Sequence, residues 1–273
     1  MMNRESIFIE VEELVTKMNN ANLRIFDTTI LFFRNETNPE TAYEKYLQAH
    51  IPGAAFFDHN DFSDPSSNYE YTILSGPEIV KQIGHIGISH DSEVILYASG
   101  VLPSATRAWW ILRYAGHNNV RILNGGLAAW VKAGGSLEQE ARQYKSSNFK
   151  GSIKSDMFAN KEEVMNAMEN SSIRLEHTLP LDMYEGVTIP GSFFFSVMDL
   201  MEEMNTFVPN DKFVPELKTE TEYERIITYC GGGIAATVNA IAHLIAGHKN
   251  VAVYDGSLFE WMGEGLPITK KEI

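Results

Sequence analysis

The sequence predicts an α/β protein made of two tandem copies of one domain, each with a mainly parallel sheet and helices on both faces. An internal repeat is the first observation: the window 94–130, which ends "ILNGGLAAW" at residue 130, matches the window 225–261, which contains "VYDGSLFEW". The second is that each window alternates short apolar stretches with a helix-period stretch. The third is a composition of 44% hydrophobic and 21% charged residues, which is typical of a chain that buries a core.

Two landmarks upstream of these windows occur in the same order in both halves of the chain. The stretch "HIPGAAFF" at 50–57 matches "TIPGSFFF" at 188–195. A fainter pair is "LRIFDTT" at 23–29 with "IRLEHT" at 173–178. Matching landmarks in one order indicate a duplicated domain rather than a chance similarity.

The stretch between the two copies, "AGGSLEQEARQYKSSNFKGSIKSD", is polar and has no apolar periodicity, so it is typical of a linker. We therefore predict an N-terminal domain at 1–140, a linker at 141–155 and a C-terminal domain at 156–273.

The elements of each copy follow from local patterns. The short stretches at 93–99 and 224–230 are β-branched or aromatic, as buried strands are, and 119–123 and 250–255 are again expected to be strands. The stretch 235–247 has apolar residues at helical spacing and ends on a glycine suited to a helix C-terminus. Strand, helix and strand joined by short turns imply a parallel sheet covered by helices.

Charge and composition exclude several partners. The chain has 22 Lys and Arg against 36 Asp and Glu, a formal net charge of −14, which argues against nucleic acid and anionic membranes. No apolar run is long enough to cross a bilayer, and the first residues, "MMNRESIFIEVEELV", contain no apolar signal segment. One cysteine cannot form an internal disulfide, so we expect a cytoplasmic location.

The single cysteine, Cys230, lies in "YCGGGIAA", between an expected strand and an expected helix. Open parallel sheets bind ligands at this position, and a glycine-rich turn before a helix can aim several N–H groups at one point. Such a turn stabilises a thiolate, and glycines leave the sulfur uncrowded. The sequence therefore predicts an accessible, activated nucleophile. The expected cradle is Gly231, Gly232, Gly233, Ile234, Ala235 and Ala236.

This loop also fits two other interpretations. A free cysteine is often a small buried hydrophobe, but a packing cysteine does not need three glycines beside it. Gly231, Gly233 and Ala236 also fit a dinucleotide fingerprint, with Asp255 ending the next strand. The first copy lacks that glycine spacing and has Asn124 in place of Asp255, and little sequence follows the motif, which disfavours a dinucleotide site.

Taken together, these motifs resemble the two-domain rhodanese family, the thiosulfate and 3-mercaptopyruvate sulfurtransferases. In the first domain the resemblance depends on "HIPGAAFFD", "ATRAWWILRYAGH" and "ILNGGLAAW", and in the second on "YCGGGIAA" and "VYDGSLFEW". The resemblance implies a catalytic second copy and an inactive first copy, and Ala98 does stand opposite Cys230. It also implies a double displacement through a cysteine persulfide, with no metal and no organic cofactor.

The chain departs from the family pattern around the thiol. Thiosulfate-using members carry basic residues after the cysteine, where this chain has glycines. Mercaptopyruvate-using members have a serine and a threonine where this chain has Gly232 and Ala235. The second-domain arginines of the family are missing from 175–188, and the first-domain aspartate and histidine linked to mercaptopyruvate fall near Asn60 and Tyr71.

We therefore expect a sulfurtransferase that moves a sulfane sulfur from thiosulfate or 3-mercaptopyruvate, through a Cys230 persulfide, to cyanide or a thiol. The missing side-chain clamps favour an alternative, a persulfide carrier or sensor without turnover. A rhodanese-like phosphatase is disfavoured, because the loop after Cys230 is short and has no arginine to close around phosphate. The expected partners are a small-molecule sulfur donor and a thiol or cyanide acceptor, with no nucleic acid and no membrane.

Several other residues are expected to have structural roles. His50 is predicted to fix a turn, and Arg107 and Arg113 to make structural pairs with carboxylates rather than face the cleft. His243 and His248 do not have the spacing of metal ligands on one helix face. The tryptophans expected in the core are Trp109, Trp110, Trp130 and Trp261. The residues expected in a solvated loop, or alternatively at the cleft mouth, are Asp58, His59, Asp61 and Asp64.

Overall fold

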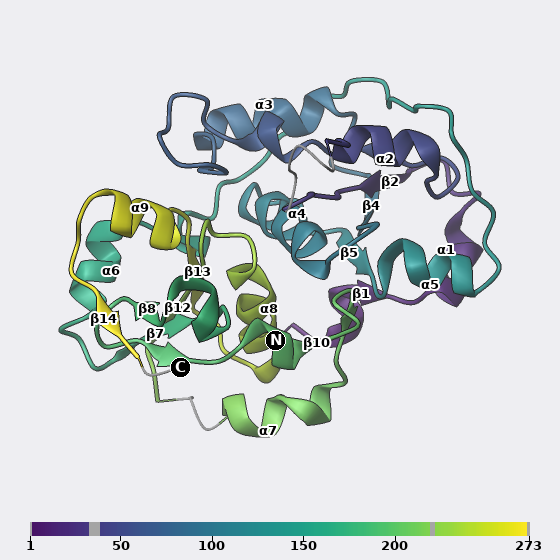
Figure 1. Ribbon diagram of the computed structural model, residues 1–273. Helices are drawn as coiled ribbons and strands as arrows, with labels where there is room; N and C mark the ends of the chain where they lie inside the picture. Colours follow the sequence, from purple (N-terminus) through teal and green to yellow (C-terminus); the bar gives the residue numbers. More distant parts are fainter. Residues whose placement is uncertain (1, 33–38, 219–221, 272–273) are drawn as a thin grey trace.

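The computed structural model describes residues 2–32, 39–218 and 222–271. Figure 1 shows two α/β units side by side, the first coloured purple to teal and the second teal to yellow. Each contains a five-stranded sheet in which all neighbouring strands are parallel. The predicted fold class, two tandem α/β domains with mainly parallel sheets, is therefore confirmed.

The first sheet has the strand order β1-β5-β4-β2-β3. Its strands are β1 (Phe8–Ile9), β2 (Leu23–Asp27), β3 (Ala55–Phe56), β4 (Glu93–Tyr97) and β5 (Val120–Leu123). Its helices are α1 (Val11–Lys17), α2 (Ala42–Gln48), α3 (Gly76–His85), α4 (Leu102–Tyr114) and α5 (Gly126–Lys132), with 3-10 turns at Arg4–Ser6 and His59–Phe62. Side chains alternate along β4: Val94 and Leu96 pack with α3 and α4, whereas Ile95 and Tyr97 pack with α1 and α5.

The second sheet repeats this arrangement in the order β6-β13-β12-β7-β9. Its strands are β6 (Phe158–Ala159), β7 (Ile173–His177), β9 (Phe193–Phe194), β12 (Arg225–Tyr229) and β13 (Val251–Tyr254). Its helices are α6 (Lys161–Ala167), α7 (Val214–Leu217), α8 (Ala236–Ala246) and α9 (Ser257–Gly263), with 3-10 turns at Ser155–Met157, Leu181–Tyr184, Val197–Leu200 and Asn210–Lys212. Two small antiparallel pairs join β10 (Met201–Glu202) to β11 (Thr206–Phe207) and β8 (Val187–Thr188) to β14 (Thr269–Lys270).

The matched residues of the two copies make matched contacts. Tyr97 Oη accepts a hydrogen bond from the Ile51 N–H at 3.2 Å, and Tyr229 Oη accepts one from the Ile189 N–H at 2.9 Å. The four tryptophans are all buried, as predicted, and Trp130 and Trp261 each donate Nε1 to a carbonyl six residues later at 2.7 Å. The repeat in the sequence is therefore a repeat in three dimensions.

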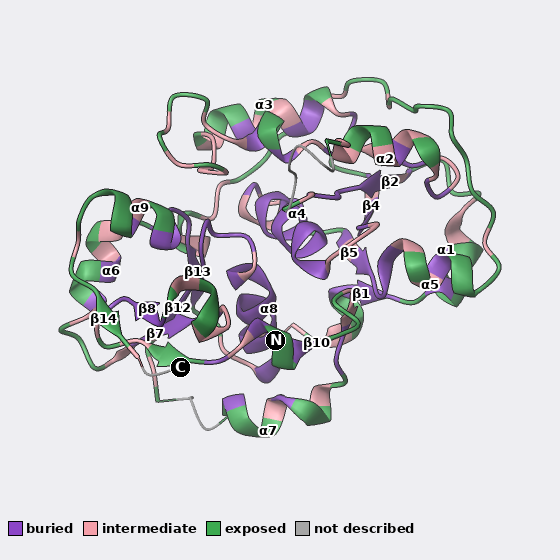
Figure 2. Cartoon of the chain, in the orientation of Figure 1, coloured by how far each residue is buried: buried purple, intermediate pink, exposed green. Residues whose placement is uncertain are grey.

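The two domains meet along α4 and α8. Both helices are buried over most of their length (Figure 2). At their crossing, the hydroxyls of Thr106 and Thr237 lie 2.7 Å apart and share a hydrogen bond. One hydrophobic cluster contains residues of both helices and of both sheets, so the two domains share a core.

The chain between the two domains follows the surface of the first domain without forming a helix or strand from 141 to 154. Tyr144 Oη donates to the Gly53 carbonyl at 2.7 Å, and the Ser147 N–H donates to the Gly84 carbonyl at 2.8 Å. The domain limits at 140 and 156 stay a prediction. Among the described residues, no helix has both the length and the apolar character that a membrane span requires.

Candidate active site

The thiol loop lies where the carboxyl ends of the second sheet meet the first domain. It joins the end of β12 at Tyr229 to the start of α8 at Ala236, as the sequence predicted. Gly233 has φ +72°, and a methyl group there would overlap the carbonyl oxygen of Asp255. Only glycine meets both conditions without strain, so the chain needs glycine at this position.

The turn after β13, at the start of α9, holds the thiol loop by hydrogen bonds to its backbone. The Cys230 N–H donates to Ser257 Oγ at 3.1 Å, and the Leu258 N–H donates to the Cys230 carbonyl at 3.1 Å. The Phe259 N–H donates to the Gly231 carbonyl at 2.8 Å. These bonds hold the backbone on both sides of the sulfur against the start of α9.

Ser257 adopts an uncommon backbone conformation beside the thiol. Its φ is +48°, in the left-handed region, where the first copy has Gly126 at φ +54°. A non-glycine residue in this region costs free energy and persists where its surroundings hold it. Here its hydroxyl donates to the Tyr254 carbonyl at 2.7 Å and accepts from the Cys230 N–H. The strained serine is therefore part of the support of the loop.

The backbone N–H groups of residues 231–236 donate to no acceptor among the residues that the structure describes. Residues 231–234 are nevertheless buried. Buried backbone donors are nearly always paired, so a run of unpaired ones at a helix N-terminus is suited to hold an anion. This arrangement supports the cradle that the sequence predicts, which stays a prediction until an anion is bound there.

Cys230 is buried, with only 2% of its surface exposed, so the expectation of an accessible sulfur is wrong. The physical reason is that aromatic side chains fill the space beside the glycines. A methyl group on Gly231 would overlap Tyr184 Oη and lie 3.3 Å from Phe259 Cζ. One on Gly232 would lie 2.9 Å from Phe259 Cδ2. The glycines thus allow close packing over the loop instead of leaving it open.

A buried ion pair joins the thiol loop to the first domain. Arg107 on α4 is 2% exposed, and its Nη2 lies 2.7 Å from Asp255 Oδ1. Arg107 also donates to the carbonyls of Gly233 at 3.1 Å and Tyr71 at 2.8 Å. The Ile73 N–H donates to the other Asp255 oxygen at 2.7 Å. The predicted structural pairing of Arg107 is confirmed, and each charged group here has several partners, which a buried pair needs.

The other arginine and the histidines have local roles. Arg113 bonds the Asn118 carbonyl at 3.1 Å, so its predicted carboxylate pairing is not found among the described contacts. His50 is buried with Nδ1 2.8 Å from the Tyr46 carbonyl of α2, and its role in fixing the following turn stays a prediction. His243 on α8 lies 3.1 Å from Glu176 in the core.

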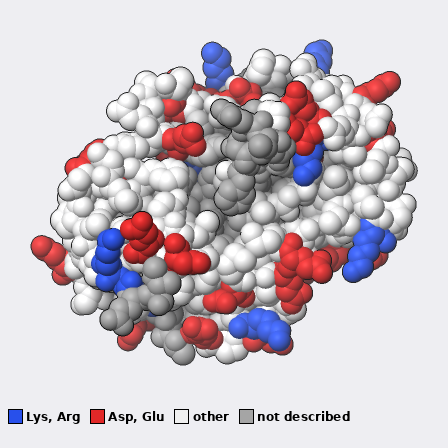
Figure 3. All heavy atoms as spheres, in the orientation of Figure 1, with Lys and Arg blue, Asp and Glu red and all other residues white. Residues whose placement is uncertain are grey.

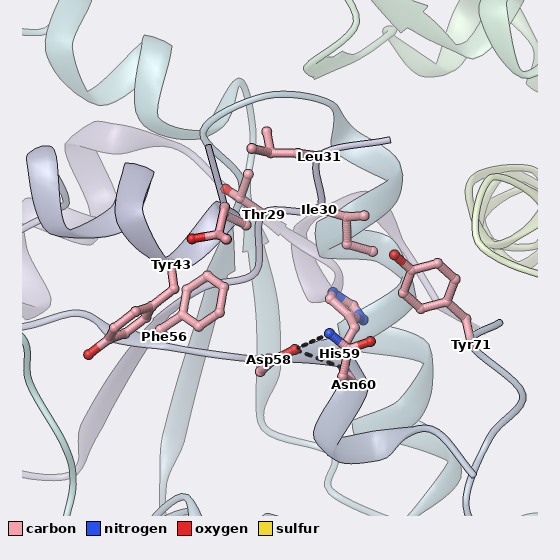
Figure 4. A pocket seen from close by; sticks show the side chains of 11 residues that line it. Thr29, Ile30, Leu31, Tyr43, Phe56, Asp58, His59, Asn60 and Tyr71 are labelled. Carbon is pink, nitrogen blue, oxygen red and sulfur yellow. Dashed lines mark hydrogen bonds between the residues drawn. The ribbon is translucent and has the colours of Figure 1, made fainter. Parts of the chain in front are cut away.

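A cavity of about 280 Å³ opens in the first domain, beyond the carboxyl ends of β2 and β3 (Figure 4). The residues that line it are Thr29, Ile30, Leu31, Thr41, Ala42, Tyr43, Phe56, Asp58, His59, Asn60 and Tyr71. The cavity therefore brings together Asn60 and Tyr71, which the sequence placed near the family's aspartate and histidine. Cys230 is not among the lining residues, and the link to the thiol loop is Tyr71, whose carbonyl bonds Arg107.

The acidic segment on this cavity is only partly solvated. Asp58 accepts hydrogen bonds from the backbone and side-chain nitrogens of Asn60, both at 2.9 Å (Figure 4). His59 is buried, with Nε2 3.1 Å from the Thr28 carbonyl, so its assignment to a solvated loop is wrong. Burial and the nearby Arg107 lower the pKa of His59 to about 3, which keeps it neutral. Asp61 is exposed, as predicted.

Charge around the thiol loop comes from dipoles more than from cations. In the described part of the chain, Arg107 alone among Lys and Arg side chains hydrogen-bonds to residues 230–236, and Asp255 neutralises it. Figure 3 shows acidic groups spread over the visible face, with fewer basic ones. Burial, and to a smaller degree the nearby Cys230, raise the pKa of Tyr184, so its phenol keeps its proton at neutral pH.

Sequence reasoning missed three residues that contact the loop: Tyr184, Ser257 and Phe259. The two copies differ at the last two, where the first has Gly126 and Ala128, and that difference was a usable signal. For Tyr184 the sequence offered no such signal, because the segment that carries it differs in length between the copies.

Comparisons with known proteins agree with the two-domain fold. The family model of the rhodanese-like domain matches residues 10–133 and 160–264. A thiosulfate sulfurtransferase from Bos taurus is 30% identical over 248 residues, which cover 84% of this chain and 82% of the relative. A 3-mercaptopyruvate sulfurtransferase from Escherichia coli (strain K12) is 26% identical over 266 residues, covering 93% of this chain and 94% of the relative. The crystal structure of SseA from Escherichia coli superposes with a TM-score of 0.79 at 25% identity, covering 94% of this chain and 99% of that one.

Proposed function

Because the chain belongs to the family of rhodanese-like domain proteins and is a sulfurtransferase of the rhodanese type, we propose that it transfers sulfur through a persulfide on Cys230. The observation that carries this proposal is the run of unpaired backbone N–H groups around the single cysteine. In the persulfide, the outer sulfur carries one negative charge, which is the kind of group that such a run of donors stabilises.

The first half of the reaction loads the sulfur. With thiosulfate as donor, the Cys230 thiolate attacks the sulfane sulfur, a new S–S bond forms, and sulfite leaves with the electron pair of the old one. With 3-mercaptopyruvate, the thiolate attacks the thiol sulfur and the C–S bond breaks. The electron pair then stays on carbon, and the thiol proton of the donor ends on the methyl group of pyruvate.

The second half returns the thiolate. Cyanide or a thiolate attacks the outer sulfur, and the electron pair of the persulfide bond returns to the Cys230 sulfur, giving thiocyanate or a new persulfide. The protein needs no net oxidant or reductant in either half. Its residues exclude water, hold the sulfur against α8 and offer hydrogen bonds to the charge that moves.

A persulfide carrier without turnover is the second candidate, and two observations favour it. Cys230 is 2% exposed, and the loop makes no hydrogen bond with a free cation among the described residues. A carrier would accept sulfur from one protein donor and pass it to another, with little use for a site that admits thiosulfate.

Intact-mass measurement separates these possibilities. The protein is mixed with thiosulfate, with 3-mercaptopyruvate or with a persulfide-loaded protein, and the gain of one sulfur atom is recorded before and after cyanide is added. Gain from a small donor and loss to cyanide support the sulfurtransferase reaction. Gain from the protein donor alone supports the carrier, and no gain from any donor contradicts both.

A further inference from the structure

The 3-10 turn Leu181–Tyr184 places one tyrosine at the thiol loop. This turn belongs to the short connection between β7 and β8, in the stretch 175–188, which contains no arginine. The next residues, Glu185 at φ +51° and Gly186 at φ +74°, reverse the chain. The Gly186 N–H donates to the Leu181 carbonyl at 2.7 Å, and the Gly186 carbonyl accepts from the Lys271 N–H at 2.9 Å. The turn is therefore held in one position.

The side chain of Tyr184 reaches the loop next to the sulfur. Its Oη touches Gly231 so closely that a methyl group on that glycine would overlap it. The ring packs edge to face on Phe259, with centroids 6.3 Å apart and planes at 66°. Phe259 is itself tied to Gly231 by the backbone bond to its carbonyl. Ring and hydroxyl are thus oriented by the same residues that shape the loop.

Among the described residues, the Tyr184 hydroxyl makes no hydrogen bond, so its proton is free to be donated. The Ser257 hydroxyl, which accepts from the Cys230 N–H, is already donated to the Tyr254 carbonyl. The raised pKa described above keeps Tyr184 in its protonated, donating form at neutral pH. Tyr184 is therefore a neutral donor at a site that lacks free cationic ones.

We propose that Tyr184 is a catalytic residue, which donates a hydrogen bond from its phenol to the sulfur that Cys230 carries. The proposal rests on the persulfide reaction proposed above. In that reaction negative charge builds up on the transferred sulfur, and a preoriented donor stabilises it more in the transition state than in the bound donor molecule. The loop amides and this phenol together replace the basic side chains that the sequence lacks.

The test is single-turnover loading of the full chain, followed by intact mass after acid quench. Thiosulfate and 3-mercaptopyruvate are each varied in concentration, with wild-type protein, Tyr184→Phe and Tyr69→Phe. The last is a matched control, because Tyr69 packs against Gly263 at the far end of α9. Loss of a hydrogen bond to a charged group predicts a maximal loading rate about 10- to 100-fold lower for Tyr184→Phe. We expect the half-saturating donor concentration to change less than about threefold, and Tyr69→Phe to stay within about twofold of wild type.

A third variant, Phe259→Leu, separates the hydroxyl from the packing of the ring. It keeps the donor and removes its support, so we expect a smaller loss than in Tyr184→Phe. An equal or larger loss would show that packing matters and would overturn the proposal. A loading rate for Tyr184→Phe within about twofold of wild type would overturn it too, while leaving the persulfide reaction intact. Wild-type protein that gains no sulfur from any donor would instead overturn the proposed function, and this role of Tyr184 with it.

Discussion

The equivalent loops of the two domains differ in what satisfies their backbone. In the first domain the Ser99 N–H donates to Thr29 Oγ1 at 2.8 Å, and Ser99 Oγ donates to Asp27 Oδ2 at 2.8 Å. The N–H of Leu102, which opens α4, donates to the Met204 carbonyl of the second domain at 2.9 Å. In the second domain the N–H groups of 231–236 have no such acceptors among the described residues. The N–H groups of Ser99 and Leu102 in the first loop are therefore paired, whereas, in the described part of the chain, their counterparts in the second loop are not.

The segments beside the two loops differ as well. Tyr71 is linked to the second loop through Arg107, Met204 bonds the first, and both adopt left-handed conformations, at φ +62° and +67°. The Met204 carbonyl accepts from the start of α4, whereas the Tyr71 carbonyl accepts from the Arg107 side chain. The comparison teaches that the two copies keep the same backbone conformation at this point but use its carbonyl differently.

The largest expected effect comes from Cys230→Ser. This variant should form no persulfide and transfer no sulfur, because the chain has no other cysteine. Folding should be unaffected, since the change is nearly isosteric and the backbone bonds of the loop remain. Sulfur transfer to cyanide and the Tm of the variant check the prediction. Turnover of Cys230→Ser at the wild-type rate would mean that sulfur transfer does not depend on the thiol of the second loop.

The next largest effect is expected from Arg107→Ala. It leaves the Asp255 carboxylate buried without its ion pair and frees the Tyr71 carbonyl, so we expect a loss of about 3–5 kcal/mol in the free energy of unfolding. Denaturant unfolding measures this loss, and activity should fall with it. Arg113→Ala is the control, because that arginine bonds one exposed carbonyl. If the free energy of unfolding of Arg107→Ala lay within about 1 kcal/mol of wild type, the stabilising role assigned to the Arg107–Asp255 pair would be contradicted.

A smaller effect is expected from alanine at the glycines of the loop. Gly233→Ala forces a side chain into a left-handed conformation against the Asp255 carbonyl, which should cost about 1–3 kcal/mol in stability and lower activity about tenfold or more. Gly232→Ala should cost less, since it meets the edge of the Phe259 ring, which can shift. Unfolding and loading rates measured for both variants test the order. The reverse order would show that Phe259 limits the loop more than its backbone does.

The smallest effect is expected from returning a thiol to the first copy. Ala98→Cys placed in the Cys230→Ser background should gain no sulfur from thiosulfate or 3-mercaptopyruvate. The first loop already bonds the Asp27 carboxylate, and the N–H groups of Ser99 and Leu102 are paired, so it offers a persulfide fewer donors. Intact mass is the measurement. Loading of this double variant would show that the first loop also stabilises a persulfide once it carries a thiol.

The sequence predicted the duplicated fold because paired residues such as Tyr97 and Tyr229, or Trp130 and Trp261, make the same local contacts in both copies. It also placed Cys230 at the end of a strand and before a helix. It did not predict that Cys230 is buried, because the covering groups Tyr184 and Phe259 come from other segments. Contacts of this kind depend on how distant segments meet, and apolar periodicity carries no record of them.

The same limit explains His59. Its neighbours Asp58 and Asp61 are polar, and the pattern of the segment indicates solvent, yet the ring turns inward to the Thr28 carbonyl. The Arg107–Asp255 pair was predicted only in kind. The sequence did not identify Asp255 as the partner of Arg107, because nothing in one sequence links a helix of the first copy to a strand end of the second.

The shared core along α4 and α8 gives the copy without a cysteine a structural role. Removing the first domain would expose the apolar face of α8 and take Arg107 away from the thiol loop. A core that runs through both halves makes them one cooperative unit, so a substitution deep in the first domain lowers the stability of the second. Selection for a stable thiol loop therefore also acts on the half that has no cysteine.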